Sequence, residues 1–370
     1  MRFPEFSGEW DSFKLVELGK FIGGGTPSSS NLSFWTGSIP WISSSDIKED
    51  NINNISISRY ITEDAIEKSA TKYCPAPVIL IVSRVGVGKV ALSHTSLCTS
   101  QDFCNIIDIK CHPVFLSYNL LRTMKRKSRE VQGTSIKGIT SDELQKIRVF
   151  IPKNKDEQNK ISNLLTLLDE RIATQNKIIE DLKKLKSAIS LKMLHSDSWE
   201  QFKIQDIASI GRGRVISSVE ISQQENPLYP VYSSQTSNDG IMGYLDDFMF
   251  EGEYISWTTD GANAGTVFYR NGKFNCTNVC GLLKLKKGFD AHFVSLVLAE
   301  ATRMYVSTNL ANPKLMNNTM GNIQIRLPKL EEQKRISVVF RKLHGLLETH
   351  NSLIIKYSKQ KQYLLSQMFI

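Results

Sequence analysis

Apolar residues recur at alternating steps of three and four over residues 156–194, which is the spacing of the buried face of a long amphipathic helix. Residues 331–369 carry the same pattern, because Ile161 matches Ile336 and the same shift of 175 residues superimposes the whole stretch. The positions that we expect in the seam between the two helices are Ile161, Leu165, Leu168, Ile172, Gln175, Ile179, Leu182 and Ile189 in the first stretch, and Ile336, Phe340, Leu343, Leu347, His350, Ile354, Tyr357 and Leu364 in the second.

Each stretch has the same entry, in which a proline just before the stretch leads to a Glu-Gln pair and an isoleucine within it. Two unrelated helices would not be expected to share a register over this length, so the chain contains a duplicated unit. A helix of about 39 residues is about 58 Å long. Short connections then predict two globular regions at opposite ends of an antiparallel helical pair, related by a pseudo-twofold axis.

Polar residues interrupt the seam at one matching position, Gln175 in the first stretch and His350 in the second. We expect these two side chains to be neighbours near the axis, where a polar break fixes the register of the helices at some cost in stability. The alternative is that both lie in water at the edge of the seam.

The regions outside the helices also share a plan. Each opens with a tryptophan and a Phe-Lys segment and continues through short apolar runs that predict strands. The strongest predicted strand covers residues 78–82, and a helix is predicted over residues 113–129. The expected fold class is α+β, with two tandem globular domains of mixed sheet and helices separated by a two-helix antiparallel coiled coil. The predicted boundaries are 1–150 and 199–327 for the domains, and 151–198 and 328–370 for the helical regions.

Composition excludes fewer classes of function than the pattern of apolar residues does. The net charge of +9 permits a nucleic-acid partner without proving one, because the basic excess is largest in residues 328–370 and is absent from residues 199–327. The six cysteines form no CxxC pair and have no histidine at ligand spacing, so we expect reduced thiols in a cytoplasmic protein and no metal site. No secretion signal or membrane-spanning stretch is visible.

Two motifs resemble parts of enzymes but are incomplete. Residues 226–229 (NPLY) resemble an amino-methyltransferase loop, yet Leu228 replaces its second proline and no glycine-rich cofactor motif accompanies it. Residues 83–90 resemble a phosphate-binding loop, but Ser83 and Val90 stand where glycine and Ser/Thr are required. With no hydrolase triad or nuclease carboxylate cluster, no catalytic residues are expected.

The loops suit contact with DNA better. Glycines beside Arg84 and Lys89 let the backbone approach a phosphate or base edge, arginine can pair with guanine, and the amides of Gln235 and Asn263 can pair with adenine. For any single residue the alternative is a solvated loop side chain. The candidate DNA-binding residues are Ser43, Ser44, Ser45, Arg84, Lys89, Lys125, Arg126, Lys137, Arg212, Arg214, Ser233, Ser234, Gln235, Thr258, Thr259, Asn263 and Lys314.

Segment 39–46 (IPWISSSD), segment 133–140 (GTSIKGIT), the opening of each repeat and the Pro–Glu-Gln–Ile motif occur here in the order domain, helix, domain, helix. With these marks the whole chain resembles the specificity subunit of type I restriction-modification systems. The second repeat departs from the pattern, because residues 309–315 (NLANPKL) replace the glycine-rich segment.

The resemblance implies a non-catalytic subunit in which each domain is a target recognition domain for one half of an asymmetric, bipartite DNA sequence, with the helices setting the spacer. Implied partners are double-stranded DNA, two modification subunits that use S-adenosylmethionine to methylate a flipped-out adenine, and restriction subunits that use ATP and Mg²⁺. No cofactor is expected on this chain, and no membrane. Two alternatives stay open: a scaffold with two protein-binding domains, and a self-sufficient methyltransferase.

Overall fold

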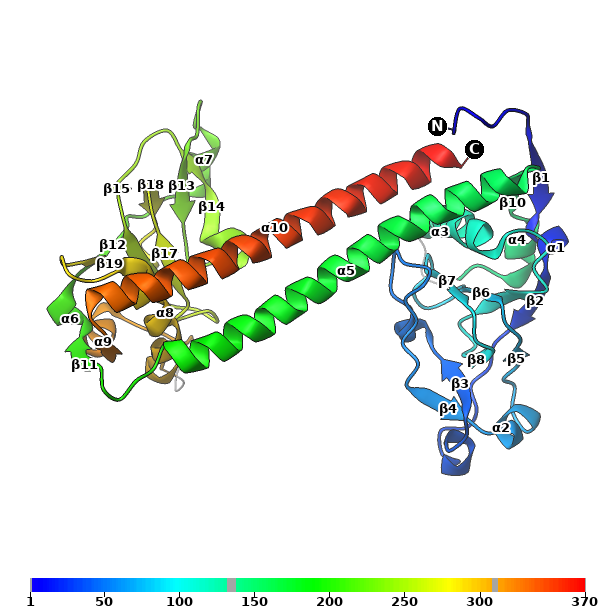
Figure 1. The fold of residues 1–370 in the computed structure, drawn as a ribbon, viewed down its shortest axis with the longest axis horizontal. Coiled ribbons are helices and arrows are strands. Elements are labelled where there is room, and N and C mark those ends of the chain that lie inside the picture. The colour runs from blue at the N-terminus through cyan, green and yellow to red at the C-terminus, as the bar shows by residue number, and fades with distance from the viewer. Residues whose placement is uncertain (1, 132–137, 308–311, 370) are drawn as a thin grey trace. The chain divides into compact units, whose positions relative to one another are not determined.

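The structure, a computed structural model, describes residues 2–131, 138–307 and 312–369. The chain forms two compact units, the first made of Met1–Lys177 with Asn351–Ile370 and the second of Ile178–His350. Two long helices, α5 (Lys155–Met193) and α10 (Leu330–Met368), each contribute one part to each unit (Figure 1).

The first unit contains three sheets. An antiparallel ladder joins β1 to β10, and the two four-stranded sheets have the orders β2-β9-β6-β7 and β4-β3-β8-β5. Strands β3 and β8 run parallel to each other. The strands are β1 (Trp10–Lys14), β2 (Lys20–Gly23), β3 (Ile39–Ile42), β4 (Arg59–Ile61), β5 (Tyr73–Cys74), β6 (Val78–Ile81), β7 (Val90–Ser93), β8 (Leu97–Thr99), β9 (Cys104–Ile107) and β10 (Arg148–Pro152). The shorter helices are α1 (Leu15–Leu18), α2 (Glu63–Glu67), α3 (Pro113–Val131) and α4 (Ser141–Lys146).

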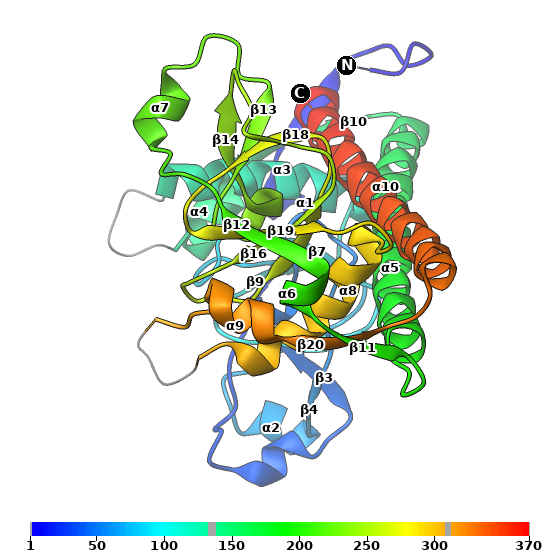
Figure 2. The ribbon, with the colours of Figure 1, turned by 90° about the vertical axis from the view of Figure 1, so that its left-hand side faces the viewer.

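The second unit, whose strands β13, β14 and β18 are labelled in Figure 2, repeats these sheets strand for strand. Its sheets are β11-β20, β12-β19-β16-β17 and β14-β13-β18-β15, and the central pair β13–β18 is again parallel. The strands are β11 (Glu200–Lys203), β12 (Ala208–Arg212), β13 (Tyr229–Tyr232), β14 (Ile241–Leu245), β15 (Phe250–Glu251), β16 (Tyr254–Thr258), β17 (Val267–Arg270), β18 (Lys273–Cys276), β19 (Cys280–Leu285) and β20 (Gln324–Leu327). The shorter helices are α6 (Ile204–Ile207), α7 (Ser218–Ser222), α8 (Ala291–Ala301) and α9 (Asn317–Asn322).

The long helices begin and end within one residue of the predicted stretches. In the first unit they run antiparallel, because Asp169 pairs with Lys361 whereas Arg171, further along α5, lies over the ring of Tyr357, earlier on α10. All predicted seam positions are buried or half-buried. Gln175 and His350 belong to different units, so their proximity stays a prediction. In the described part of the chain, no helix has the length and apolar character needed to cross a membrane.

Each core is completed by both long helices. In the first unit the ring of Phe115 on α3 lies 5.6 Å from Trp10 and 5.2 Å from Phe369, which follows the end of α10. In the second unit the ring of Trp199 lies 5.8 Å from Phe293 on α8. Residues of the long helices buried in these cores are Ile161, Leu165, Leu168, Leu364, Leu365 and Met368 in the first unit, and Ile336 and Phe340 in the second. Leu194, directly after the end of α5, is also buried in the second core.

The glutamine of the repeated Glu-Gln motif explains why the motif stands in the first turns of each long helix. Gln158 accepts a hydrogen bond from the backbone N–H of His112 at 3.1 Å and donates one to the carbonyl of Pro152 at 2.8 Å. Gln333 makes the equivalent pair of bonds in the second unit, at 2.9 and 2.8 Å. A buried amide therefore satisfies backbone groups on two other segments at the start of each long helix.

A buried ion pair joins α5 to α10 in the first unit. Lys361 is bonded to Asp169, and the hydroxyl of Tyr118 donates to the same carboxylate at 2.8 Å. Burial lowers the pKa of Lys361, and the Asp169 carboxylate partly offsets this effect. The matching positions in the second unit are His344, which is exposed, and Lys186, which is half-buried. The second unit therefore lacks an equivalent buried pair at these two matching positions.

We expect Asp169→Ala to lower the free energy of unfolding by about 3 kcal/mol, because it leaves a buried ammonium without its carboxylate. Chemical denaturation followed by circular dichroism measures this loss. The double change Asp169→Leu with Lys361→Met should recover most of it, and His344→Ala at the matching position should cost less than about 0.5 kcal/mol. An Asp169→Ala protein as stable as the parent would contradict the assignment.

A histidine lies beside each long helix at equivalent places. Nδ1 of His112 is 3.1 Å from the hydroxyl of Ser162 on α5, and Nδ1 of His292 is 3.0 Å from that of Ser337 on α10. Burial lowers the pKa of His112. Burial, with a further contribution from Arg341, lowers the pKa of His292 to about 4. Both rings are therefore neutral near pH 7.

Acid should destabilise the second unit through His292. Its pKa is lower in the folded than in the unfolded chain, so the unfolded state binds the proton first. The contribution of the neutral ring is complete above about pH 6.5 and is lost as the pH falls toward 4. Thermal unfolding measured between pH 7.5 and 5 should show a smaller acid-induced drop in Tm for His292→Gln than for the parent. Equal drops would contradict this expectation.

Candidate nucleic-acid interface

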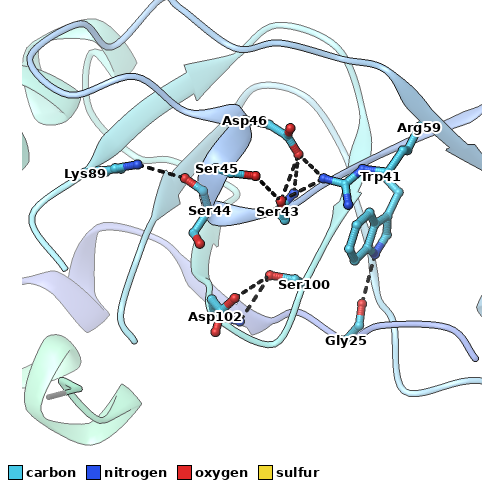
Figure 3. A network of polar contacts seen from close by, with 10 residues as sticks. All are labelled: Gly25, Trp41, Ser43, Ser44, Ser45, Asp46, Arg59, Lys89, Ser100 and Asp102. Carbon is cyan, nitrogen blue, oxygen red and sulfur yellow. Dashed lines mark hydrogen bonds and ion pairs between the residues drawn. The ribbon is translucent and has the colours of Figure 1, made fainter. Parts of the chain in front are cut away.

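In the first unit, loops gather at one edge of the sheet that contains β3 and β8. Because these strands run parallel, their carboxyl ends lie at the same edge, where the β3 loop (residues 43–46) and the β8 loop (residues 100–102) begin. The β6 loop (residues 83–89), which connects β6 to β7, lies against both of them (Figure 3).

Hydrogen bonds connect these loops. The backbone N–H of Ser83 donates to the carbonyl of Asp102 at 2.8 Å, and Nζ of Lys89 donates to the carbonyl of Ser44 at 3.1 Å. The structure thus brings five of the predicted residues into one cluster: Ser43, Ser44, Ser45, Arg84 and Lys89.

The side chains of this cluster differ in how far they are available to a partner. Ser45 and Arg84 are exposed, whereas Lys89 is half-buried. Gly86 and Gly88 adopt φ angles of +89° and +114°, which side chains rarely tolerate, so the β6 loop requires glycine at both positions. A Cβ at Gly86 would lie in open space apart from the Lys89 side chain, so this turn presents backbone to the surface.

The β3 loop is held by a residue that no sequence motif marked. The guanidinium of Arg59 on β4 lies against the ring of Trp41 and binds both Ser43 and Asp46 (Figure 3). The indole N–H of Trp41 donates to the carbonyl of Gly25 at 3.0 Å. The hydroxyls of the β3 loop are therefore oriented by a network whose members are distant in sequence.

Helix α3, which carries two predicted basic residues, passes beside the β6 loop, because a Cβ at Gly88 would come within 3.1 Å of the Ser128 hydroxyl. Arg126 is exposed, whereas Lys125 is half-buried and forms an ion pair with Asp50. That pairing leaves Lys125 less available for a phosphate than its charge predicted. Lys137 lies outside the described residues.

The second unit carries an equivalent loop cluster. The β13 loop (residues 233–240) follows the parallel strand β13, and the β16 loop (residues 259–266) connects β16 to β17. Lys314 pairs with Asp260 of the β16 loop through an isolated β-bridge. Asn263 and Lys314 are exposed, whereas Ser233, Ser234 and Gln235 are half-buried.

Two residues predicted to contact DNA are not on the surface. Thr258 and Thr259 are 1% and 2% exposed. Their hydroxyls donate to the carbonyls of Ser234 at 3.5 Å and Val279 at 3.0 Å. They hold the β13 loop and the turn between β18 and β19 from inside the unit. The sequence pattern could not distinguish this supporting role from a contact at the surface.

Arg212, Arg214 and Gln235 are also engaged inside the second unit. Arg212 donates to the amide oxygen of Asn317 at 2.9 Å, and Gln235 donates to the carbonyl of Ile241 at the start of β14. Arg214 forms an ion pair with Glu220, which raises the pKa of Arg214 and lowers that of the carboxyl. These bonds compete with any contact to a partner.

The glycine between the two arginines serves internal packing rather than approach to DNA. A Cβ at Gly213 would lie 1.6 Å from the carbonyl oxygen of Cys276, at the end of β18. Gly24 in the first unit is in the same situation, 2.0 Å from the carbonyl oxygen of Ser100. The backbone at Gly24 therefore passes against the end of β8, and the backbone at Gly213 passes against the end of β18.

Comparison with known proteins agrees with this duplicated architecture. The chain matches the family model of the type I restriction modification DNA specificity domain twice, over residues 7–184 and 196–356. The crystal structure of the type I restriction-modification system S subunit from M. genitalium has a TM-score of 0.71 at 18% identity and covers 100% of this chain and 99% of that chain.

Relatives of known sequence point the same way. The type I restriction enzyme MpnII specificity subunit of Mycoplasma pneumoniae is 41% identical over 177 residues, which are 46% of this chain and 53% of that protein. The MjaIX specificity subunit of Methanocaldococcus jannaschii is 33% identical over 186 residues, 48% of this chain and 42% of that protein. Each alignment thus spans about half of either protein. With both of its halves matched by the family model, the chain belongs to the family of the type I restriction modification DNA specificity domain.

Proposed function

We propose that this chain is the sequence-reading subunit of a type I restriction-modification complex, and that each unit reads one half of an asymmetric, bipartite DNA site. The observation that carries the proposal is the repeated loop cluster at the carboxyl ends of the parallel strand pairs, β3–β8 and β13–β18. Loops on a rigid sheet scaffold are suited to recognition, because the scaffold fixes their position while their sequence varies.

The two clusters offer different chemistry to a base pair. The first presents the exposed guanidinium of Arg84, and guanine offers two acceptors to such a group in the major groove. The second presents the exposed amide of Asn263, whose donor and acceptor match adenine, with the ammonium of Lys314 nearby to contact phosphate. Different side chains on matching scaffolds support different half-sites, with the first unit reading the 5′ half and the second the 3′ half.

Catalysis in this proposal belongs to partner subunits in the cytoplasm. Two modification subunits would carry S-adenosylmethionine and methylate an adenine that they flip out of the duplex. Restriction subunits would carry ATP and Mg²⁺. The chain itself would bind no cofactor. The unbroken helices α5 and α10, of 39 residues each, would set the number of base pairs between the half-sites.

The proposal is tested by co-purifying the chain with its genomic neighbours and mapping methylated adenines in the host genome. We expect a two-part motif, of which one half changes when residues 1–150 are exchanged for those of another such subunit. We also expect binding to weaken steeply as salt rises, because phosphate contacts release counterions. Binding indifferent to salt and DNA sequence would favour a protein scaffold, and methyl transfer by the purified chain alone would contradict a non-catalytic role.

Arg84 offers a sharper test within the first unit. Its side chain is exposed and, among the described residues, makes no hydrogen bond or ion pair, so Arg84→Ala should change the free energy of unfolding by less than about 0.5 kcal/mol. Binding to DNA should weaken by about 1–3 kcal/mol, through the first half-site alone. Competition binding with duplexes altered in one half measures this effect. Arg148→Ala, an exposed arginine on β10, is the control, and equal losses for both variants would contradict the assignment.

A further inference from the structure

In both units an arginine lies on an aromatic ring of the strand that leads into a candidate reading loop. In the first unit Arg59 is paired with Trp41 across the β3–β4 ladder, and its Cζ is 4.6 Å from the ring centroid. In the second unit Cζ of Arg270 is 3.6 Å from the ring centroid of Tyr232, at the end of β13. Arg59 comes from the sheet that contains β3, whereas Arg270 comes from β17 in the neighbouring sheet. The same arrangement is therefore built from different strands.

Arg59 ties the β3 loop to the strand before it. Its Nη2 donates to the hydroxyl of Ser43 at 2.7 Å and forms an ion pair with Asp46. Asp46 in turn accepts a hydrogen bond from the backbone N–H of Ser43 at 2.7 Å, and the Ser43 hydroxyl lies 2.9 Å from that of Ser45 (Figure 3). The direction of the serine hydroxyls thus depends on where the guanidinium holds the carboxylate.

Arg270 supports the β13 loop from inside the second unit. Its side chain is 3% exposed, and its Nε donates to the hydroxyl of Ser256 at 2.9 Å. Its Nη1 lies 3.9 Å from the exposed carboxylate of Asp239, and a Cβ at Gly240 would come within 3.1 Å of its Nη2. Asn238 and Asp239 adopt φ angles of 49° and 57°. Residues other than glycine adopt such angles only at a cost in conformational free energy. A loop in this conformation needs support from its surroundings.

The chemistry of both supports is specific to arginine. A planar guanidinium can stack on an aromatic face while its edge binds a hydroxyl and a carboxylate, whereas a lysine ammonium is a point charge that cannot do both. We propose that Arg59 and Arg270 are positioning residues, each of which sets the base preference of one half-site by fixing the β3 loop or the β13 loop. The inference rests on the proposed function, since it assumes that these loops face DNA.

The test uses the full chain assembled with its modification subunits and duplexes that carry the mapped site with single base-pair changes in either half. R59K retains the charge but loses the planar guanidinium with its several N–H donors. It should therefore reduce discrimination between base pairs in the first half-site about tenfold and leave that in the second unchanged. R270K should do the reverse. R148K and R326K, at exposed arginines on β10 and β20, are charge-conserving controls that should leave both half-sites unchanged.

Because Arg270 is buried, R270K can destabilise the second unit, and D239N provides a variant that leaves the core intact. Asp239 is 74% exposed, so its amide form should keep the parent Tm while discrimination in the second half-site falls. D46N serves the same purpose in the first unit. Discrimination that stays at the parent level in R59K and D239N, or that falls equally in both half-sites, would overturn the inference. A parent complex without a two-part site would instead refute the proposed function.

Discussion

The burial of apolar side chains from both long helices in each globular core is the interaction on which the rest of the structure depends. In the first unit, Phe115 packs between Trp10 and Phe369, and residues from the start of α5 surround them. In the second, Phe293 packs on Trp199 together with the start of α10 and the end of α5. The stabilisation from hydrophobic burial grows with the apolar area removed from water. In these cores, much of that area comes from residues that are distant in the sequence. The helices are therefore structural parts of the domains as well as connections between them.

This arrangement separates what is constant in the two units from what differs. Gln158 and Gln333 satisfy equivalent backbone groups, and the strand order is the same in all three pairs of sheets. The loops at the ends of β3 and β13 are supported by arginines from different strands. A scaffold that draws its stability from the helices and sheets can tolerate such changes, because loop side chains contribute little to the core. Recognition can then diverge while the fold is kept.

The repeated hydrophobic pattern predicted the long helices to within one residue and the main strands, because period and run length are local signals. Arg59 and Arg270 were missed, because their roles arise from strand pairing and sheet packing between distant segments. Helix α4 was also missed, although Thr140 and Glu143 form a capping box that marks its start. Gly213, between the candidate residues Arg212 and Arg214, is required because the end of β18 passes close to its backbone. A contact between segments this far apart in sequence leaves no local signal, so the sequence pattern did not predict it.

The contribution of α10 to the first core has a consequence for the order of folding during synthesis. The second unit is one continuous stretch, Ile178–His350, whereas the first needs residues from Asn351 onward, including Phe369. Domains generally fold in the order in which they leave the ribosome. In this chain the amino-terminal domain keeps an open apolar surface until the last helix emerges, so the second domain can reach its native state first. The core of the first unit would then be completed only after the ribosome has made the last residue of α10.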